Sequence, residues 1–285
     1  MFKKIGSRPG VTLSEPLHFE SMALMSGGYT QVVLHPREEA GFSISRPGQA
    51  PISFNEASVV DASQRMTQIG FNGDRVMLVE HLLSALTGMK IDSAHIEVTG
   101  PEIPIFDGSG AVFARALAAV AKKRAADVDI YELVQPFEVE DGASQYLLTP
   151  HMTSHKSGFK WHCVIDYSAV PSIGLQSYDY DSTATSYLEE VSLARTFCLE
   201  QEAQMMQAKG LIKAATLDNG VVFNMQGPLN PEGLRFSNEP VRHKLLDLMG
   251  DLAPLGVDLR FQGVALKPGH KGNNSLAKII REKLV

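Results

Sequence analysis

The sequence EPVRHKLLDLMGD, at residues 239–251, decides how the rest of this chain is interpreted. At about 100° per residue, His243, Asp247 and Asp251 fall within one arc of a helix together with Lys244. The apolar residues of the stretch occupy the other side, so one face is expected to pack while the other carries polar chemistry. An imidazole and a carboxylate spaced i and i+4 can converge on one metal ion. An ion pair on a solvated face explains the same pattern, and the stretch alone leaves both interpretations open.

Length and composition are those of a soluble globular protein. The 285 residues suffice for one large domain or two of ordinary size, and 44% of them are hydrophobic. The net charge of -6 disfavours a nucleic-acid groove or an anionic membrane surface as partner. No targeting segment is recognisable and no apolar run approaches about 18 residues, so we expect a cytoplasmic protein without a membrane span. Cys163 and Cys198 are expected to be packed thiols.

A second stretch with ionisable groups is VMLVEHLLSALTG, at residues 76–88. It is apolar nearly all round and closes on a glycine, which predicts a buried helix. Glu80 and His81 are adjacent inside it, although charged side chains are seldom buried without a partner. The pair therefore indicates a functional site, and a satisfied core histidine beside a structural glutamate is the alternative.

The predicted elements follow a similar order in the two halves of the chain. The first half is predicted to contain a hairpin-like pair of strands at 29–34 and 41–45, the helix 76–88, a strand at 94–98, a loop at 100–110 and a helix at 111–126. The second half is predicted to contain strands at 133–140, 145–148 and 159–166, a helix at 200–208, a strand at 220–224, the helix 239–251, a strand at 257–266, a loop at 267–274 and a helix at 275–283.

This order predicts an α+β fold of two related, sandwich-like domains packed face to face with a site between them. We place the domains at residues 1–126 and 127–285, with the boundary in the charged segment that precedes residue 131. The second domain carries an insertion at about 194–233, and long insertions of this kind often hold substrate contacts.

Packing of the two halves would bring three candidate ligands together. His81, His243 and Asp247 form a set of two histidines and one carboxylate, and three protein ligands with one position left for water are typical of a catalytic zinc site. Glu80, directly beside a ligand, is expected to take a proton from metal-activated water as general base. The set predicts metal-assisted hydrolysis of an amide or an ester.

A third histidine completes this hypothesis. His270 lies in a glycine-flanked stretch and is expected to act as a cationic acid or electrostatic stabiliser. Asp251, one turn beyond Asp247, is expected to hold the ring of His270 in place.

Six ordered segments resemble a known family, the bacterial UDP-3-O-acyl-N-acetylglucosamine deacetylases, which are zinc enzymes of lipid A biosynthesis. The segments are VEHL at 79–82, PEIPIFDGS at 101–109, ARTF at 194–197, GLRF at 233–236, RHKLLDLMGD at 242–251 and GHKGNN at 269–274. The resemblance covers most of the chain. It implies two related α+β domains with the metal site between them, an N-deacetylase activity, zinc as cofactor, and an acylated, nucleotide-linked amino sugar as substrate.

The resemblance also assigns residues. It places zinc ligands on His81, His243 and Asp247, the base on Glu80, and a second histidine on His270 with Asp251 behind it. It implies that Thr196 hydrogen-bonds the tetrahedral oxyanion, that Phe197 and Tyr167 line the substrate site, and that Lys244 meets a phosphate or sugar oxygen. Asp107 is expected to cap the helix that follows it rather than to touch substrate.

The chain departs from the family pattern in the region that is implied to bind the nucleotide. Met25 stands where the family usually has a histidine, Ser144 aligns near a family lysine, and residues 166–176 differ from the family segment. The departures motivate an alternative, a paralogue that deacylates a different N-acyl sugar or small amide. The same residues allow two further hypotheses. One is a binding protein that has lost turnover, which the retained chemical positions disfavour. The other is a non-haem iron oxygenase, which Glu80 disfavours because a base beside the metal ligands favours hydrolysis.

Overall fold

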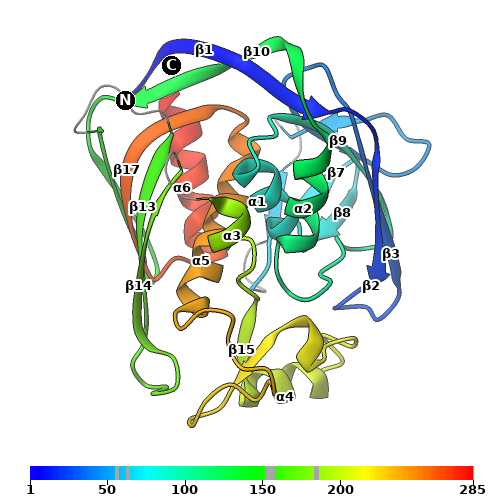
Figure 1. The fold of residues 1–285 in the computed structure, drawn as a ribbon, viewed down its shortest axis with the longest axis vertical. Coiled ribbons are helices and arrows are strands. Elements are labelled where there is room, and N and C mark those ends of the chain that lie inside the picture. The colour runs from blue at the N-terminus through cyan, green and yellow to red at the C-terminus, as the bar shows by residue number, and fades with distance from the viewer. Residues whose placement is uncertain (55–57, 62–64, 152–157, 183–185, 285) are drawn as a thin grey trace.

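Helices lie between two β-sheets in this mixed α+β structure, a computed structural model that describes residues 1–54, 58–61, 65–151, 158–182 and 186–284 (Figure 1). Its α-helices are α1 (Glu80–Gly88), α2 (Ala111–Val120), α3 (Tyr187–Glu190), α4 (Glu200–Ala208), α5 (Glu239–Leu252) and α6 (His270–Lys283). Short 3-10 turns occupy Leu217–Asn219 and Ala253–Leu255. In the described ranges, no helix is both long and apolar enough to cross a membrane.

The sheets flank the helices on opposite sides (Figure 1). One has the order β2-β3-β9-β4-β5, formed by Leu17–Met22, Tyr29–His35, Ser93–Thr99, Gly41–Ser45 and Ile52–Ser53. The other is seven-stranded, with the path β1-β10-β17-β12-β11 formed by Phe2–Leu13, Ala121–Leu133, Asp258–Leu266, Ser144–Thr149 and Phe137–Asp141. Its remaining strands are β13 (Phe159–Tyr167), which pairs with β17, and β14 (Gly174–Asp181).

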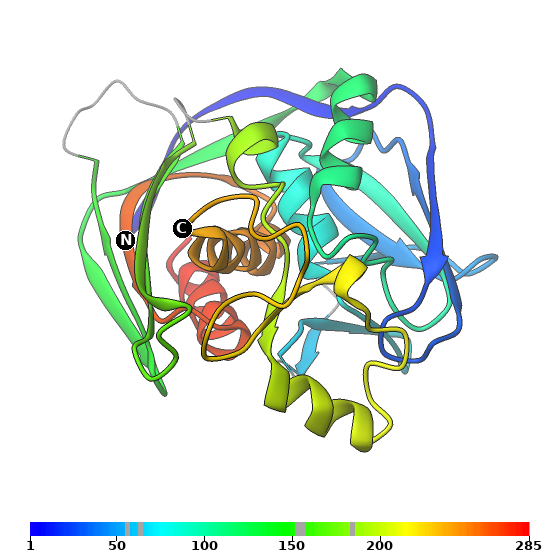
Figure 2. The same cartoon turned by 60° about the horizontal axis from the view of Figure 1, so that its bottom comes forward.

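Two smaller sheets are also present among the described residues. One joins β6 (Ser58–Asp61), β7 (Gln68–Phe71) and β8 (Asp74–Met77), and the other joins β15 (Phe197–Leu199) and β16 (Val221–Phe223). The second belongs with α4 to a lobe that projects from the body of the molecule (Figures 1 and 2).

The core forms where the sheets bury one face against the helices. In β9, Ala94, Ile96 and Val98 are buried, whereas His95 and Glu97 alternate with them on the opposite face. The helix α1 is buried from Glu80 to Leu86, because it is packed against both α2 and α5. A helix that is apolar nearly all round is therefore placed at the centre of the fold.

Most elements predicted from the sequence are confirmed, but the hairpin of residues 29–45 is wrong. The strands β3 and β4 exist, yet β9 lies between them, antiparallel to β3 and parallel to β4. A parallel neighbour requires a long crossover, and residues between β4 and β9, which include α1, supply it.

Three predicted helix boundaries are also wrong. The helix predicted at 76–88 begins only at Glu80, because the preceding residues end β8 and Leu78 has a left-handed backbone, with φ of 58°. The helix predicted at 111–126 ends at Val120, where pairing of the next residues with β1 overrides the helix propensity of an alanine-rich stretch. The last helix begins at His270 rather than 275, so His270 lies in its first turn and not in a loop.

The predicted strand at 133–140 is divided between the end of β10 and β11. The predicted domain boundary at residue 126 falls inside β10, which pairs with β1 and with β17. The division into residues 1–126 and 127–285 remains a prediction.

Candidate metal centre and active site

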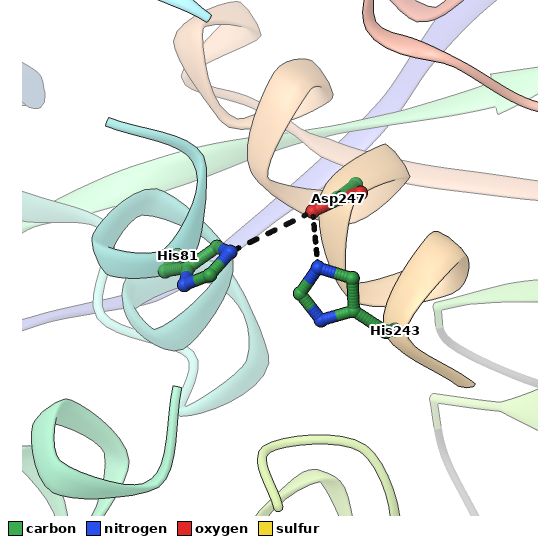
Figure 3. Close-up of side chains that lie close together, drawn as sticks. All are labelled: His81, His243 and Asp247. Atoms are coloured by element: carbon green, nitrogen blue, oxygen red, sulfur yellow. Dashed lines mark ion pairs between the residues drawn. The ribbon is translucent and has the colours of Figure 1, made fainter. Parts of the chain in front are cut away.

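His81, His243 and Asp247 converge on one point between α1 and α5 (Figure 3). Each offers one ligand atom, and these atoms all lie within 4.8 Å of one another. Asp247 Oδ1 is 3.3 Å from His243 Nε2 and 3.8 Å from His81 Nε2. The i and i+4 spacing on α5 supplies two of the ligands, and the packing of α1 against α5 supplies the third.

The three side chains fit a bound metal ion. Among the described residues, Asp247 Oδ1 is buried without a hydrogen-bond partner, although a buried polar atom ordinarily has one. Burial lowers the pKa of His81 to about 4 and that of His243 to about 3, so both imidazoles are neutral, the form that binds metals. His243 Nδ1 donates to the backbone oxygen of Ala194 over 3.1 Å, which leaves Nε2 to face Asp247. Two imidazoles and a carboxylate form a donor set that suits zinc.

Electrostatics keep the Asp247 carboxylate ionised. Burial alone would raise its pKa, but the neighbouring cations Lys244 and His270 hold the pKa of Asp247 well below the usual range of an aspartate. Lys244 Nζ donates to Asp247 Oδ2 over 2.7 Å. Lys244 thus holds one carboxylate oxygen, while the other is directed between the two histidines.

Glu80, next to His81 in the first turn of α1, is 2% exposed. Burial raises the pKa of its carboxyl group to about 7. Its Oε2 accepts a hydrogen bond from the backbone N–H of Thr67 over 3.1 Å, and its Oε1 lies 3.8 Å from His270 Nε2. A carboxylate that lines the cavity and has a pKa near neutrality has the properties of a general base.

His270 and Asp251 contact each other as the sequence analysis expected. His270 Nδ1 donates to Asp251 Oδ2 over 2.9 Å, and His270 Nε2 lies 3.8 Å from Asp247 Oδ2. Burial works to lower the pKa of His270, but Asp251 and Asp247 raise it to about 9. His270 is therefore a buried cation that faces both Glu80 and the metal centre.

These groups line a cavity of about 880 Å³. Its charged and polar lining includes Glu80, His81, His243, Asp247 and His270. Leu24, Met25, Met66, Phe197, Met206 and Ile212 form much of its apolar wall. One cavity is thus lined both by the charged groups and by apolar side chains that suit a hydrocarbon chain.

The remaining predicted site residues lie around the same cavity. Thr196, Phe197, Tyr167 and Lys244 all line it. The Phe197 ring lies 6.4 Å from the ring of His243 and 5.6 Å from that of Tyr167, and Lys244 Nζ lies 5.6 Å from its centroid. Contact of these residues with substrate remains a prediction.

The departures noted in the sequence lie at the cavity as well. Met25 lines it, and its loop is held by Glu102, whose carboxylate accepts from the backbone N–H groups of Met25 and Ser26 over 3.1 and 3.2 Å. Ser144 also lines it and donates to the backbone oxygen of Lys267 over 2.8 Å. Tyr167 of the third departing segment lines it too, and the neighbouring Asp166 pairs with Lys267 Nζ over 3.0 Å.

The prediction that Asp107 caps a helix is wrong. Asp107 Oδ1 accepts from Ser109 N–H and hydroxyl, and Oδ2 accepts from Arg235 over 2.8 Å. The hydroxyl of Ser109 accepts from Ala111 at the start of α2 instead. Asp107 therefore ties the turn before α2 to the segment before α5.

Thr67, Asn273 and Tyr146 belong to the hydrogen-bond network around Asp251, although the sequence did not predict a role for them. Asn273 Nδ2 donates to Asp251 Oδ2 over 2.8 Å, and Tyr146 OH donates to Asn273 Oδ1 over 2.6 Å. Asn273 lies in the segment GHKGNN, but no local pattern marks Thr67 or Tyr146, because their contacts are made by segments distant in sequence.

Comparison with known proteins identifies the family of this chain. A family model, LpxC, UDP-3-O-acyl N-acetylglycosamine deacetylase, matches residues 11–282. A UDP-3-O-acyl-N-acetylglucosamine deacetylase of Aquifex aeolicus is 33% identical over 276 residues, which cover 95% of this chain and 93% of the relative. Proteins of the same name from Anaeromyxobacter dehalogenans and Myxococcus xanthus are 37% and 36% identical to this chain. Each alignment covers 94% of this chain, together with 85% of the first relative and 84% of the second. The chain belongs to the UDP-3-O-acyl N-acetylglycosamine deacetylase family.

Proposed function

We propose that this protein removes the N-acetyl group of UDP-3-O-acyl-N-acetylglucosamine with a zinc ion bound by His81, His243 and Asp247. The observation that carries the proposal is the convergence of three buried ligand atoms within 4.8 Å beside Glu80. Family membership and the names of the relatives support the substrate. The resemblance implies a place in lipid A biosynthesis and a cytoplasmic enzyme.

Zinc would supply Lewis-acid polarisation of the amide carbonyl and a water of lowered pKa. Glu80 accepts the proton of the attacking water, for which its carboxylate edge faces the centre of the site. His270, a cation held by Asp251, donates a proton to the departing amine nitrogen. Thr196 stabilises the developing oxyanion from the cavity wall.

Substrate recognition is assigned to the rest of the cavity. The apolar wall around Met66, Met206 and Ile212 accepts the acyl chain. Phe197 and Tyr167 pack against the sugar, and Lys244 binds one of its oxygens or a phosphate oxygen. Because Lys244 also holds Asp247, substrate binding and the charge of the metal ligand are linked.

The test is turnover of UDP-3-O-acyl-N-acetylglucosamine by zinc-loaded protein, together with the metal content of the variants. His81→Ala and Asp247→Ala are expected to lose both metal and turnover. Glu80→Ala is expected to keep the metal and lose turnover by roughly 10²–10⁴-fold, the usual contribution of a general base. The exposed His18 offers a matched control, and His18→Ala should keep both.

Two results would overturn the proposal. Protein that turns over the substrate with no bound metal would remove the zinc mechanism. Fully loaded protein that leaves the substrate intact would favour the paralogue reading motivated by Met25 and Ser144, and a panel of other N-acyl sugars would then identify the substrate.

A further inference from the structure

Thr67 contacts two carboxylates that stand on different helices. It lies immediately before β7 and is 1% exposed. Its backbone N–H donates to Glu80 Oε2 over 3.1 Å, and its hydroxyl donates to Asp251 Oδ1 over 2.5 Å. One residue therefore connects the base on α1 with the carboxylate on α5 that holds His270.

The hydroxyl of Thr67 completes the hydrogen bonding of Asp251. Asp251 Oδ2 accepts from His270 Nδ1 and from Asn273 Nδ2, over 2.9 and 2.8 Å, and Oδ1 accepts from Thr67. Donors on both oxygens fix the plane of a carboxylate, because rotation about its last bond would break at least one of these bonds.

The direction of the Thr67 hydroxyl is also determined. A hydroxyl has one proton to donate and two lone pairs that accept. Asn274 Nδ2 donates to Thr67 Oγ1 over 3.4 Å, and Oγ1 lies 3.3 Å from His270 Nδ1. With lone pairs facing these two groups, the proton is directed to Asp251.

We propose that Thr67 is a positioning residue for the hydrolysis, and this inference rests on the proposed function. Its amide orients the base Glu80, and its hydroxyl, acting through Asp251, orients His270. The result is that His270 Nε2 stands 3.8 Å from Glu80 Oε1 and 3.8 Å from Asp247 Oδ2. Reactive groups must be held to within about 0.5 Å, so a small rotation of Asp251 would be felt in the rate.

Thr67 acts through its neighbours and not on substrate. Met66 lines the cavity, whereas Thr67 is not among the described residues that do. The hydroxyl bonds of Thr67 are made to members of this network, so an isosteric valine would keep the packing and the amide while removing the hydroxyl.

The experiment compares Thr67→Val with Thr67→Ser in zinc-loaded protein. Thr67→Val should lower kcat by roughly 10- to 100-fold, the kinetic equivalent of one hydrogen bond to a charged group, with KM and zinc content nearly unchanged. Thr67→Ser keeps the hydroxyl and should retain most of the wild-type kcat. Thr12, another buried threonine whose hydroxyl donates to the backbone oxygen of Ser93 over 3.0 Å, provides the control Thr12→Val, which should leave kcat unchanged.

A readout without substrate separates this inference from the proposed function. The Nδ1–H proton of His270, assigned by its loss in His270→Gln, should give a low-field proton NMR signal in the wild type and in Thr67→Ser. In Thr67→Val the signal should shift or broaden. Failure of the wild type to turn over the substrate would defeat the proposed function, and the NMR comparison would still decide the role of Thr67.

Two outcomes would overturn the role of Thr67. Thr67→Val with the kcat and the His270 signal of the wild type would show that the hydroxyl positions nothing. Thr67→Ser impaired as strongly as Thr67→Val, although it keeps the hydroxyl, would show that the hydroxyl does not set the rate.

Discussion

A β-carbon on Gly250 would lie 2.1 Å from the backbone oxygen of Glu80. Real β-carbons do not approach backbone atoms this closely, so only glycine allows α5 to come this near to α1. The contact joins the residue proposed as base to the turn of α5 that precedes Asp251. The separation of the metal ligands therefore depends on a missing side chain.

Gly250→Ala is expected to destabilise the protein and weaken metal binding. Within a helix, alanine is more favourable than glycine by up to about 1 kcal/mol. A loss of stability would therefore have to come from the forced separation of α1 and α5, and overpacking of this kind typically costs about 1–3 kcal/mol. Denaturant unfolding and zinc affinity would measure it. A β-carbon on Gly227 meets nothing within 4 Å, so Gly227→Ala is the control. A Gly250→Ala protein with unchanged stability would mean that the helices can adjust.

Arg195 and Glu239 form a buried ion pair at the entry to α5, and the two side chains are 2% and 1% exposed. Arg195 Nε donates to Glu239 Oε1 over 2.9 Å. Arg195→Met would leave the carboxylate of Glu239 buried without its cation, which costs about 3–5 kcal/mol in comparable sites. Arg195→Met with Glu239→Gln should recover part of that loss in the free energy of unfolding, since no unpaired charge remains. Equal losses in the single and double variants would contradict the charge argument.

Acid should destabilise the outer face of the five-stranded sheet through His95. Burial, followed by the nearby His35, lowers the pKa of His95, and Glu97 and Arg37 also face it. Since the folded-state pKa is the lower one, the unfolded chain binds more protons as pH falls through the ordinary histidine value of about 6.5, and stability decreases. Between pH 7 and pH 5 the melting temperature of wild type should fall more than that of His95→Gln. Parallel curves for the two proteins would remove His95 from the explanation.

Arg65, which lines the cavity, forms an ion pair with Glu202 on α4, in which Arg65 Nη1 and Nη2 donate to the carboxylate over 2.6 and 2.5 Å. Exposed pairs contribute little to global stability, about 0–1 kcal/mol. Arg65→Ala should therefore leave the melting temperature almost unchanged while amide exchange in α4, which has no buried residue, becomes faster. The double swap Arg65→Glu with Glu202→Arg should restore slow exchange. Unchanged exchange in Arg65→Ala would show that other contacts hold α4.

Two parts of the candidate site could be predicted from sequence because each of them is local. His243 and Asp247 are one helical turn apart, and Glu80 and His81 are adjacent in a helix that excludes other charges. The hydroxyl that aligns Asp251 could not be predicted. Thr67 meets Asp251 across 184 sequence positions, and no spacing rule connects them.

The order of the strands could not be predicted either, because it also depends on contacts between residues that are distant in sequence. Residues 29–34 and 41–45 have strand composition, which predicts their conformation but not their neighbours. The placement of β9 between them depends on the return of the chain after α1. Likewise Ala121–Leu133 pairs as a strand because β1 and β17 lie beside it, and its own sequence favours a helix at the start.

The first strand of the chain has a consequence for synthesis. Phe2 pairs with Leu133 and bridges to Leu284, and β10 in turn pairs with β17 (Figure 1). Residues 13 and 258, the end of β1 and the start of β17, are separated by 245 positions. At about 5–20 residues per second, a ribosome needs on the order of ten to fifty seconds to make that interval. The β1–β10 pair can form once residue 133 has been made, but β10 lacks its other neighbour until β17 has been made, which makes completion of the seven-stranded sheet one of the last steps of folding.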